Sequence, residues 1–164
     1  LNSLAPAIAE SEFRKCCGSA AWTRQMVAAR PFVSLEQMIE VADRVWWSLP
    51  QDDWLEAFRS HPKIGEKKAA AETSAQSKQW SAAEQAGVAE AADSTLQQLG
   101  EQNQLYQEKF GHIFIVCATG KSSEEMLDHL CLRLKNEPEQ ELRIAAGEQA
   151  KITQLRLRKL ILDS

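Results

Sequence analysis

The sequence predicts an all-α fold, a single compact domain of about seven to eight helices that covers residues 1–164. Apolar residues recur three and four positions apart over most of the chain, the spacing that places them on one face of a helix. Serines precede several of these stretches, with glutamate or glutamine three residues later, as is typical of helix starts. The one strongly apolar run, residues 113–118, has no partner strand elsewhere in the chain. Because a lone strand cannot satisfy its own backbone groups, we expect a buried extended segment or a helix start there.

Proline and capping patterns divide the first part of the chain. Arg30-Pro31 ends a first helical segment, because the residue before a proline is pushed away from helical dihedral angles. Residues 34–37, Ser-Leu-Glu-Gln, fit a capping box for the next helix, which continues until Pro50. A short helical segment over residues 52–59 follows, and His61-Pro62-Lys63-Ile64-Gly65 interrupts the pattern.

Similar patterns predict the later helices. Ser81-Ala82-Ala83-Glu84 fits a second capping box, which predicts the start of the longest amphipathic helix, and Gly111 ends that helix. A third box, residues 122–125, begins the next helix. Glu137-Pro138-Glu139 starts the last helix, because proline and acidic residues are favoured at a helix amino end.

Composition excludes several classes of protein. Hydrophobic residues make up 44% of the 164 residues and charged residues 26%, near the globular average, which excludes disorder, collagen and coiled-coil fibres for the whole chain. The 19 basic and 23 acidic residues give a net charge of −4, so we expect no nucleic-acid partner. No stretch approaches the roughly eighteen consecutive apolar residues of a membrane span, so we expect no membrane association.

The cysteines and the chain ends favour a cytoplasmic location. Cys16 and Cys17 are adjacent and form a poor disulfide framework, and Cys117 lies in the apolar run as a small buried hydrophobe. We therefore expect reduced thiols. The first residues lack the order of a signal peptide, and the last three are not a known targeting signal.

The sequence argues against a phosphate-binding loop and against a metal site. Gly120-Lys121-Ser122 resembles a phosphate-binding loop, but that motif needs a glycine five residues earlier, where Ile115 stands. Helix capping by Ser122 explains the segment better. The three histidines show no metal-ligand spacing, so we expect no metal site.

His61 and Glu84 are the candidates for chemistry, and each has a plain alternative. His61 precedes Pro62 on a loop that Gly65 lets turn sharply, so its ring could enter a cleft and exchange protons near neutral pH. A solvent-facing or core histidine is equally compatible with the spacing. Glu84 either reaches back to the Ser81 amide, or turns with Gln85 toward His61 at the positive end of a helix, where anions are favoured.

Arg156 and the tryptophans are similarly ambiguous. Arg156 shares a turn with Ile152 and Leu155, so it leans toward the core and needs a carboxylate or a ligand oxygen as partner. Otherwise the basic residues 156–159 simply stabilise the carboxyl end of a helix. The Trp46-Trp47 pair and Trp54 favour core or subunit contact over a stacking platform.

Five segments, in order and with compatible spacing, resemble the 2-oxo-4-hydroxy-4-carboxy-5-ureidoimidazoline (OHCU) decarboxylase family. They are Arg30-Pro31-Phe32, His61-Pro62-Lys63-Ile64-Gly65, Ser81-Ala82-Ala83-Glu84-Gln85, Phe114-Ile115-Val116-Cys117-Ala118 and residues 152–157. The resemblance runs from about Phe13 to Leu160. It implies an all-helical, cofactor-free, homodimeric enzyme of urate breakdown that forms (S)-allantoin.

The resemblance also implies roles for individual residues. His61 matches the catalytic proton donor, Pro62 lines the pocket beside it, and Glu84 matches the second residue implicated in catalysis. Arg156 matches a substrate-contacting arginine. The remaining substrate-binding positions are Ser81, Ala82, Ala83, Gln85, Phe114, Ile115, Val116, Cys117 and Ala118.

The implied chemistry agrees with the lack of a cofactor motif. An adjacent ring carbonyl of the substrate can take the electron pair left by carbon dioxide as an enolate, so no added electron sink is needed. Two other hypotheses remain: a non-catalytic helical module that binds a small ureide, and a purely structural dimerisation domain. In the latter, His61 and Glu84 would have no reason to converge.

Overall fold

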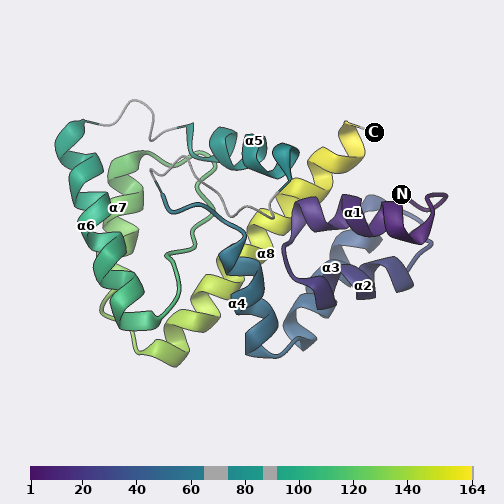
Figure 1. Cartoon of the computed structure of the whole chain (residues 1–164), viewed down its shortest axis with the longest axis horizontal. Helices are drawn as coiled ribbons and strands as arrows, with labels where there is room; N and C mark the ends of the chain where they lie inside the picture. The colour runs from purple at the N-terminus through teal and green to yellow at the C-terminus, as the bar shows by residue number, and fades with distance from the viewer. Residues whose placement is uncertain (65–73, 87–91, 164) are drawn as a thin grey trace. The chain divides into compact units, whose positions relative to one another are not determined.

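The computed structural model describes residues 1–64, 74–86 and 92–163 (Figure 1). Eight helices and no strand occur in these ranges, which confirms the predicted all-α class and number of helices. They are α1 (Pro6–Cys16), α2 (Ala20–Ala28), α3 (Leu35–Ser48), α4 (Gln51–Arg59), α5 (Ala75–Glu84), α6 (Asp93–Phe110), α7 (Ser123–Arg133) and α8 (Pro138–Leu162). None of these helices combines the length and apolarity needed to cross a bilayer.

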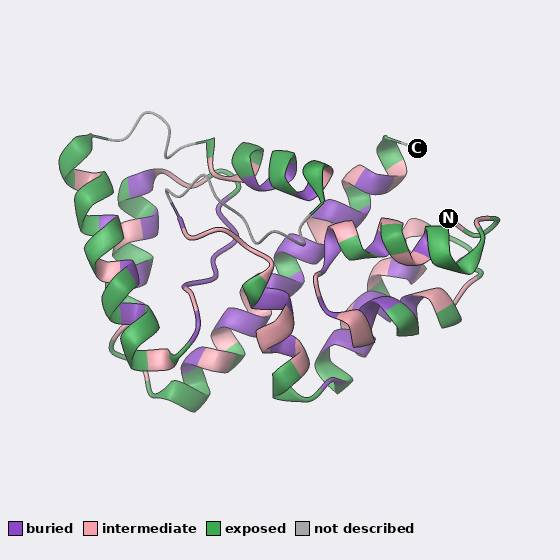
Figure 2. Cartoon of the chain, in the orientation of Figure 1, coloured by how far each residue is buried: buried purple, intermediate pink, exposed green. Residues whose placement is uncertain are grey.

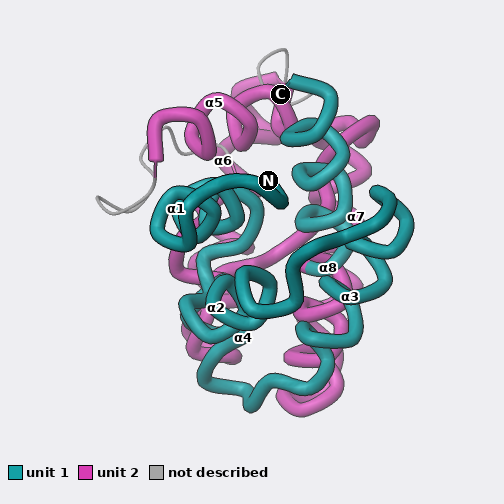
Figure 3. Tube along the Cα trace, turned by 90° about the vertical axis from the view of Figure 1, so that its right-hand side faces the viewer, with its two compact units in different colours: residues 1–57, 150–164 teal, residues 58–149 magenta. Residues whose placement is uncertain are grey.

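The chain forms two compact units (Figure 3). Unit 1 contains Leu1–Ala57 and Ala150–Ser164, and unit 2 contains Phe58–Gln149. The single domain over residues 1–164 stays a prediction.

Unit 1 is organised around Trp22 of α2. Its indole Nε1 donates to the Ala42 carbonyl of α3 at 3.0 Å, and its ring meets that of Phe13 edge-on at 6.1 Å. Trp22 and Phe13 are fully buried, so this contact of α1, α2 and α3 forms an apolar core with its one polar atom paired. The helical segment expected before Arg30 consists of two helices, α1 and α2. They are separated at Cys17, whose backbone is extended.

The expected cap at residues 34–37 is correct in its serine half. The Ser34 hydroxyl accepts from the Gln37 backbone N–H at 3.1 Å. The Gln37 side chain reaches the N–H of Val33 at 2.7 Å, instead of that of Ser34. Ser34 is nevertheless the N-cap of α3, as predicted.

Unit 2 contains a second core, formed where α6 and α7 meet residues 113–118. Its most buried members are Leu99, Tyr106, Phe114, Met126 and Leu130. Residues 113–118 form neither a helix nor a strand, and residues 114–118 are buried (Figure 2). The expected burial is therefore confirmed, and the alternative of a helix start is not. Gly111 ends α6 in the left-handed conformation at φ 77°, and Ser122 with Glu125 forms both halves of a capping box, so these two expectations are confirmed.

The predicted helix start at Ser81 is wrong. Ser74 caps α5 by accepting from the Ser77 N–H at 3.1 Å, and Ser81 lies buried in the last turn of that helix. A serine three residues before a glutamate also occurs inside helices, so the pattern alone could not tell the two positions apart. The expected helix over residues 81–110 is instead the end of α5 followed by α6. Residues 87–91, and the turn expected at Gly65, lie outside the described residues.

Candidate active site

His61 lies just beyond α4 and is tied to α8. Its backbone N–H donates to the Phe58 carbonyl at 3.1 Å, and its ring is half-buried. The ring Nε2 lies 2.7 Å from Oε1 of Gln149, which is completely buried. An orientation fixed from a buried side chain argues against a mobile, solvent-facing histidine. Pro62 beside it is also half-buried.

The segment Phe114–Ala118 is buried throughout, and side chains bind three of its backbone polar groups. Arg133 Nη1 donates to the Ile115 carbonyl at 2.7 Å. At Cys117, the N–H donates to Glu148 Oε2 and the carbonyl accepts from Lys121 Nζ, both at 2.7 Å. These bonds replace the partner strand that the sequence lacks.

The segment Ser81–Gln85 occupies the carboxyl end of α5. Ser81 is buried, Ala82 and Ala83 are exposed, and Glu84 and Gln85 are half-buried. Glu84 is the last helical residue and Gln85 is the C-cap. The expected position at the positive end of a helix is therefore wrong, because a carboxyl end carries the negative pole. That end suits hydrogen-bond donors, such as ureido N–H groups, better than it suits an anion.

The charge of Glu84, in the segment Ser81–Gln85, acts on Cys117, in the segment Phe114–Ala118. The pKa of the Cys117 thiol is raised, first by burial and then by the negative charges of Glu148 and Glu84. Glu84 thus influences the segment that contains Cys117, and Glu148 both bonds to that segment and precedes the residue that holds His61. The meeting of His61 and Glu84 in one cavity stays a prediction.

Arg156 belongs to unit 1. Its side chain is 3% exposed, and its Nη1 donates to the Lys15 carbonyl at 3.4 Å. This confirms the lean toward the core expected from its position in the turn. Its positive charge opposes the burial that raises the pKa of the Cys16 and Cys17 thiols, that of Cys17 to about 12. Arg158, by contrast, is exposed.

Two residues that hold the predicted segments, Glu148 and Gln149, were not among the residues predicted from the sequence. Both lie on α8, and they interrupt the small residues Ala145-Ala146-Gly147 and Ala150. Two polar side chains among small residues indicate a contact with another segment. The small residues let that segment approach closely, and the buried polar atoms then need hydrogen-bond partners on it. The large apolar residues of this helix predict its buried face, but they do not point to this polar pair.

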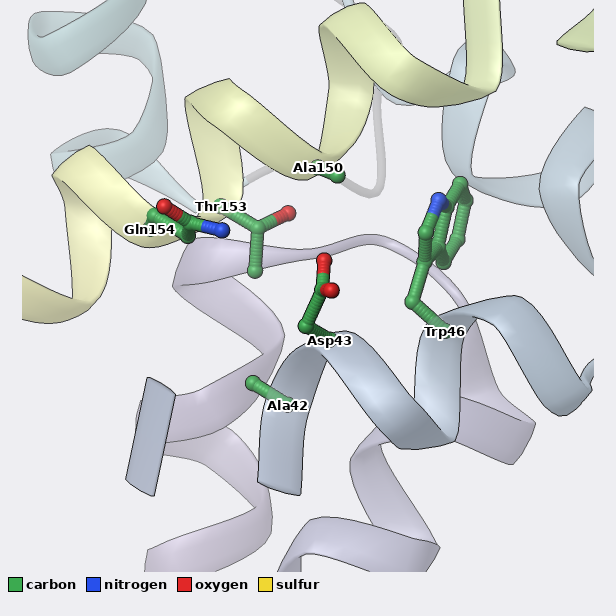
Figure 4. A pocket seen from close by; sticks show the side chains of 6 residues that line it. All are labelled: Ala42, Asp43, Trp46, Ala150, Thr153 and Gln154. Carbon is green, nitrogen blue, oxygen red and sulfur yellow. The ribbon is translucent and has the colours of Figure 1, made fainter. Parts of the chain in front are cut away.

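Two pockets lie in unit 1, and neither is lined by a predicted site residue. The first lies between α3 and α8, where Asp43 of α3 points toward Thr153 of α8 (Figure 4). It encloses about 10 Å³, room for about one water molecule. The second, about 150 Å³, is lined by residues near the amino terminus, Phe32 and Ile161. In the described ranges, no three His, Cys, Asp or Glu side chains are grouped to hold a metal ion.

Comparisons with known proteins agree with the fold. The model of the OHCU decarboxylase family matches residues 2–158. The "Uric acid degradation bifunctional protein TTL" of Arabidopsis thaliana is 41% identical over 98% of this chain, which spans only 49% of that relative. The OHCU decarboxylase of Mus musculus is 30% identical, over 80% of this chain and 74% of its own length.

A solved structure matches as well. The crystal structure of OHCU decarboxylase in the presence of (S)-allantoin has a TM-score of 0.77 and 40% identity, and the match covers 91% of this chain and 96% of that one. The fold and these relatives define the class, an all-helical protein similar to enzymes of urate degradation. The chain belongs to the OHCU decarboxylase family. The relatives' names support decarboxylation and do not support the non-catalytic ureide-binding alternative.

Proposed function

We propose that this chain converts OHCU to (S)-allantoin and carbon dioxide. The observation that carries the proposal is the match, at 40% identity and over nearly the whole of both chains, to an OHCU decarboxylase solved with (S)-allantoin. The predicted site segments and the residues that hold them lie within the residues that match the family.

The reaction needs no external electron sink. The carbon–carbon bond to the carboxylate breaks, carbon dioxide leaves, and the electron pair passes into the ring. In an imidazoline whose reacting carbon carries both hydroxyl and carboxyl, the neighbouring ring unsaturation is a C=N bond. That bond, rather than the ring carbonyl expected above, receives the pair, and its nitrogen takes up a proton to become N–H. The hydroxyl loses its proton as a carbonyl forms, and the ureido-bearing carbon gains a proton on one face. We infer from this chemistry that the enzyme works without cofactor or metal.

The residues divide the work as follows. His61 transfers a proton, and Glu84 and Gln85 hold the hydroxyl and ureido groups. Donors on the ureido group suit the carboxyl end of α5, where Glu84 and Gln85 lie. The surrounding positions, which line the pocket, are Pro62, Ser81, Ala82, Ala83, Phe114, Ile115, Val116, Cys117 and Ala118. Positioned acid–base help accelerates such a step by roughly 10²–10⁴.

Arg156 holds a carbonyl or ureido oxygen rather than the departing carboxylate. A bidentate grip on that carboxylate would stabilise the ground state more than the transition state and would slow the step. Burial of Arg156, in contrast to exposed Arg158, supports it as the binding arginine. A crystal structure with a stable product analogue tests this; a guanidinium far from every ligand oxygen would refute it.

Assembly and location are part of the proposal. A homodimer is supported by the family resemblance and by exposed apolar side chains, such as Leu132 at 63% and Leu105 at 50%. A cytoplasmic location is supported by the four free cysteines. The proposed partner is the small-molecule substrate, without nucleic acid or membrane. Light scattering on a sizing column measures the assembly state, and a monomer at micromolar concentration would contradict the dimer.

The activity is tested by generating the unstable substrate in place from urate and following the circular dichroism of allantoin. The enzyme should give one enantiomer quickly, whereas a binding module leaves the slow racemic background. His61→Ala should reduce turnover by about 10²–10⁴ without unfolding the chain. His129→Ala, at an exposed histidine of α7, is the matched control and should leave turnover unchanged. A His61→Ala variant as fast as the wild type would remove His61 from the mechanism.

A further inference from the structure

One turn of α8 holds two of the predicted site segments. Gln149 Oε1 lies 2.7 Å from Nε2 of His61, 88 positions earlier in the chain. Glu148 Oε2 accepts from the N–H of Cys117, 31 positions earlier, also at 2.7 Å. Neighbouring residues on a helix point about 100° apart, so the pair can serve two segments on different sides of the same turn.

Gln149 orients the His61 ring through a neutral amide group. Its carbonyl oxygen accepts the proton on Nε2, so in the neutral ring Nδ1 is the nitrogen that can accept a proton. A carboxylate in this position would stabilise the imidazolium, whereas a neutral amide favours that form less. Gln149 is completely buried, so water does not compete for the bond.

Glu148 fixes the backbone of Phe114–Ala118. A carboxylate that accepts a backbone N–H makes a charge-assisted bond, stronger than a neutral one. Lys121 Nζ holds the carbonyl of the same residue, Cys117, at 2.7 Å, so side chains hold both polar backbone groups of that residue. The segment has no strand partner in the described part of the chain, and its placement therefore depends on such side-chain bonds.

We propose that Glu148 and Gln149 are positioning residues of the active site. Gln149 orients His61 for proton transfer through Nδ1, and Glu148 holds the substrate-binding segment at Cys117. The roles rest on the proposed function, because they assume that His61 and this segment meet the substrate. Small displacements of reacting groups can cost about 10²-fold in rate, so we expect these side chains to affect turnover without touching the substrate.

For Gln149, the test compares two variants of similar size. Gln149→Met keeps the length and volume of the side chain and removes the acceptor, while Gln149→Glu keeps an acceptor oxygen. Gln140→Met, at an exposed position of the same helix, is the control. We expect Gln149→Met to lower kcat at least about 10-fold with little change in KM, because the ring loses its orientation. A side chain that merely fills space predicts normal kcat for Gln149→Met.

A spectroscopic readout accompanies the kinetics. In wild type, the His61 ring proton on Nε2 should be slow to exchange and visible in a ¹⁵N-correlated NMR spectrum, with its assignment given by its loss in His61→Ala. It should persist in Gln149→Glu and Gln140→Met and disappear in Gln149→Met. A wild-type kcat and an unchanged ring signal in Gln149→Met would overturn the proposal for Gln149.

For Glu148, the informative pair is Glu148→Gln and Glu148→Leu. The glutamine retains an oxygen that can accept from Cys117, and the leucine does not. We expect the leucine variant to raise KM at least about 10-fold and the glutamine variant to restore most of the affinity. Equal KM values in both variants would overturn the role of Glu148. If the wild type itself fails to decarboxylate OHCU, the proposed function falls, while the ring signal still reports on the contact between Gln149 and His61.

Discussion

Replacing Glu141 with leucine tests the polar network that supports the buried segment of unit 2. Glu141 is completely buried on α8, and three side chains donate to its carboxylate. Tyr106 and Arg133 Nε reach Oε1 at 2.5 and 2.7 Å, and Asn136 reaches Oε2 at 2.9 Å. Arg133 Nη2 forms an ion pair with Oε1 at 2.6 Å, although it makes no well-directed hydrogen bond there. Arg133 in turn holds the Ile115 carbonyl.

The expected cost follows from what the substitution leaves behind. Glu141→Leu removes the carboxylate that accepts from Tyr106, Arg133 and Asn136, and it leaves Arg133, whose side chain is 9% exposed, without its counter-charge. Breaking a buried ion pair in this way costs about 3–5 kcal/mol of unfolding free energy. With a urea dependence of about 2 kcal/mol per molar, the unfolding midpoint should fall by about 1.5–2.5 M.

Urea titration followed by circular dichroism and tryptophan fluorescence measures the effect. Glu139→Leu, at an exposed acidic residue in the first turn of the same helix, is the control and should change stability by less than about 0.5 kcal/mol. Adding Arg133→Met to Glu141→Leu should recover part of the loss, because an apolar pair replaces the unpaired charge. If Glu141→Leu and Glu139→Leu unfold at the same urea concentration, the network does not stabilise the unit as argued.

Two glycines of unit 2 and one histidine give further predictions. Gly111→Ala should destabilise the protein by about 1 kcal/mol or more, because the φ of Gly111 is 77°. Gly100→Ala should stabilise it by about 0.5–1 kcal/mol, because Gly100 lies inside α6 with open space around it. Urea midpoints that move in the same direction in both variants would contradict this. Burial lowers the pKa of His112 below its ordinary value of 6.5, so the unfolded chain takes up this proton at higher pH than the folded chain. The contribution of neutral His112 to stability is therefore present above about pH 6.5 and is lost as the pH falls below that value. The drop in urea midpoint from about pH 7.5 to about pH 5.5 should be larger in wild type than in His112→Phe, and equal drops would show that His112 is not the group.

Local patterns were sufficient where a structural feature depends on neighbours in the sequence. Ser34, Ser122, Gly111 and Pro138 mark helix ends because caps and φ preferences act within about four residues. The buried run 113–118 was also recognisable, because its residues are almost all apolar. The same local reasoning failed at Ser81, where one pattern fits both a helix start and the last turn of a helix.

The candidate site shows the opposite case. His61 and the segment 114–118 were found by their residue types and their resemblance to a family, but the residues that hold them were not. Gln149 stands 88 positions from His61, and Glu148 stands 31 from Cys117. Nothing in either sequence neighbourhood specifies these pairs.

By itself, the sequence determined the helical class, most helix ends and the residue types available for acid–base chemistry, because each depends on interactions within a few residues. Only the tertiary structure decided that Glu84 lies at the negative end of a helix, that Arg156 is buried while Arg158 is exposed, and that Gln149 holds His61. Those outcomes depend on tertiary packing, which brings side chains from distant parts of the sequence within hydrogen-bond distance. The residues next to each side chain in the sequence do not specify such contacts.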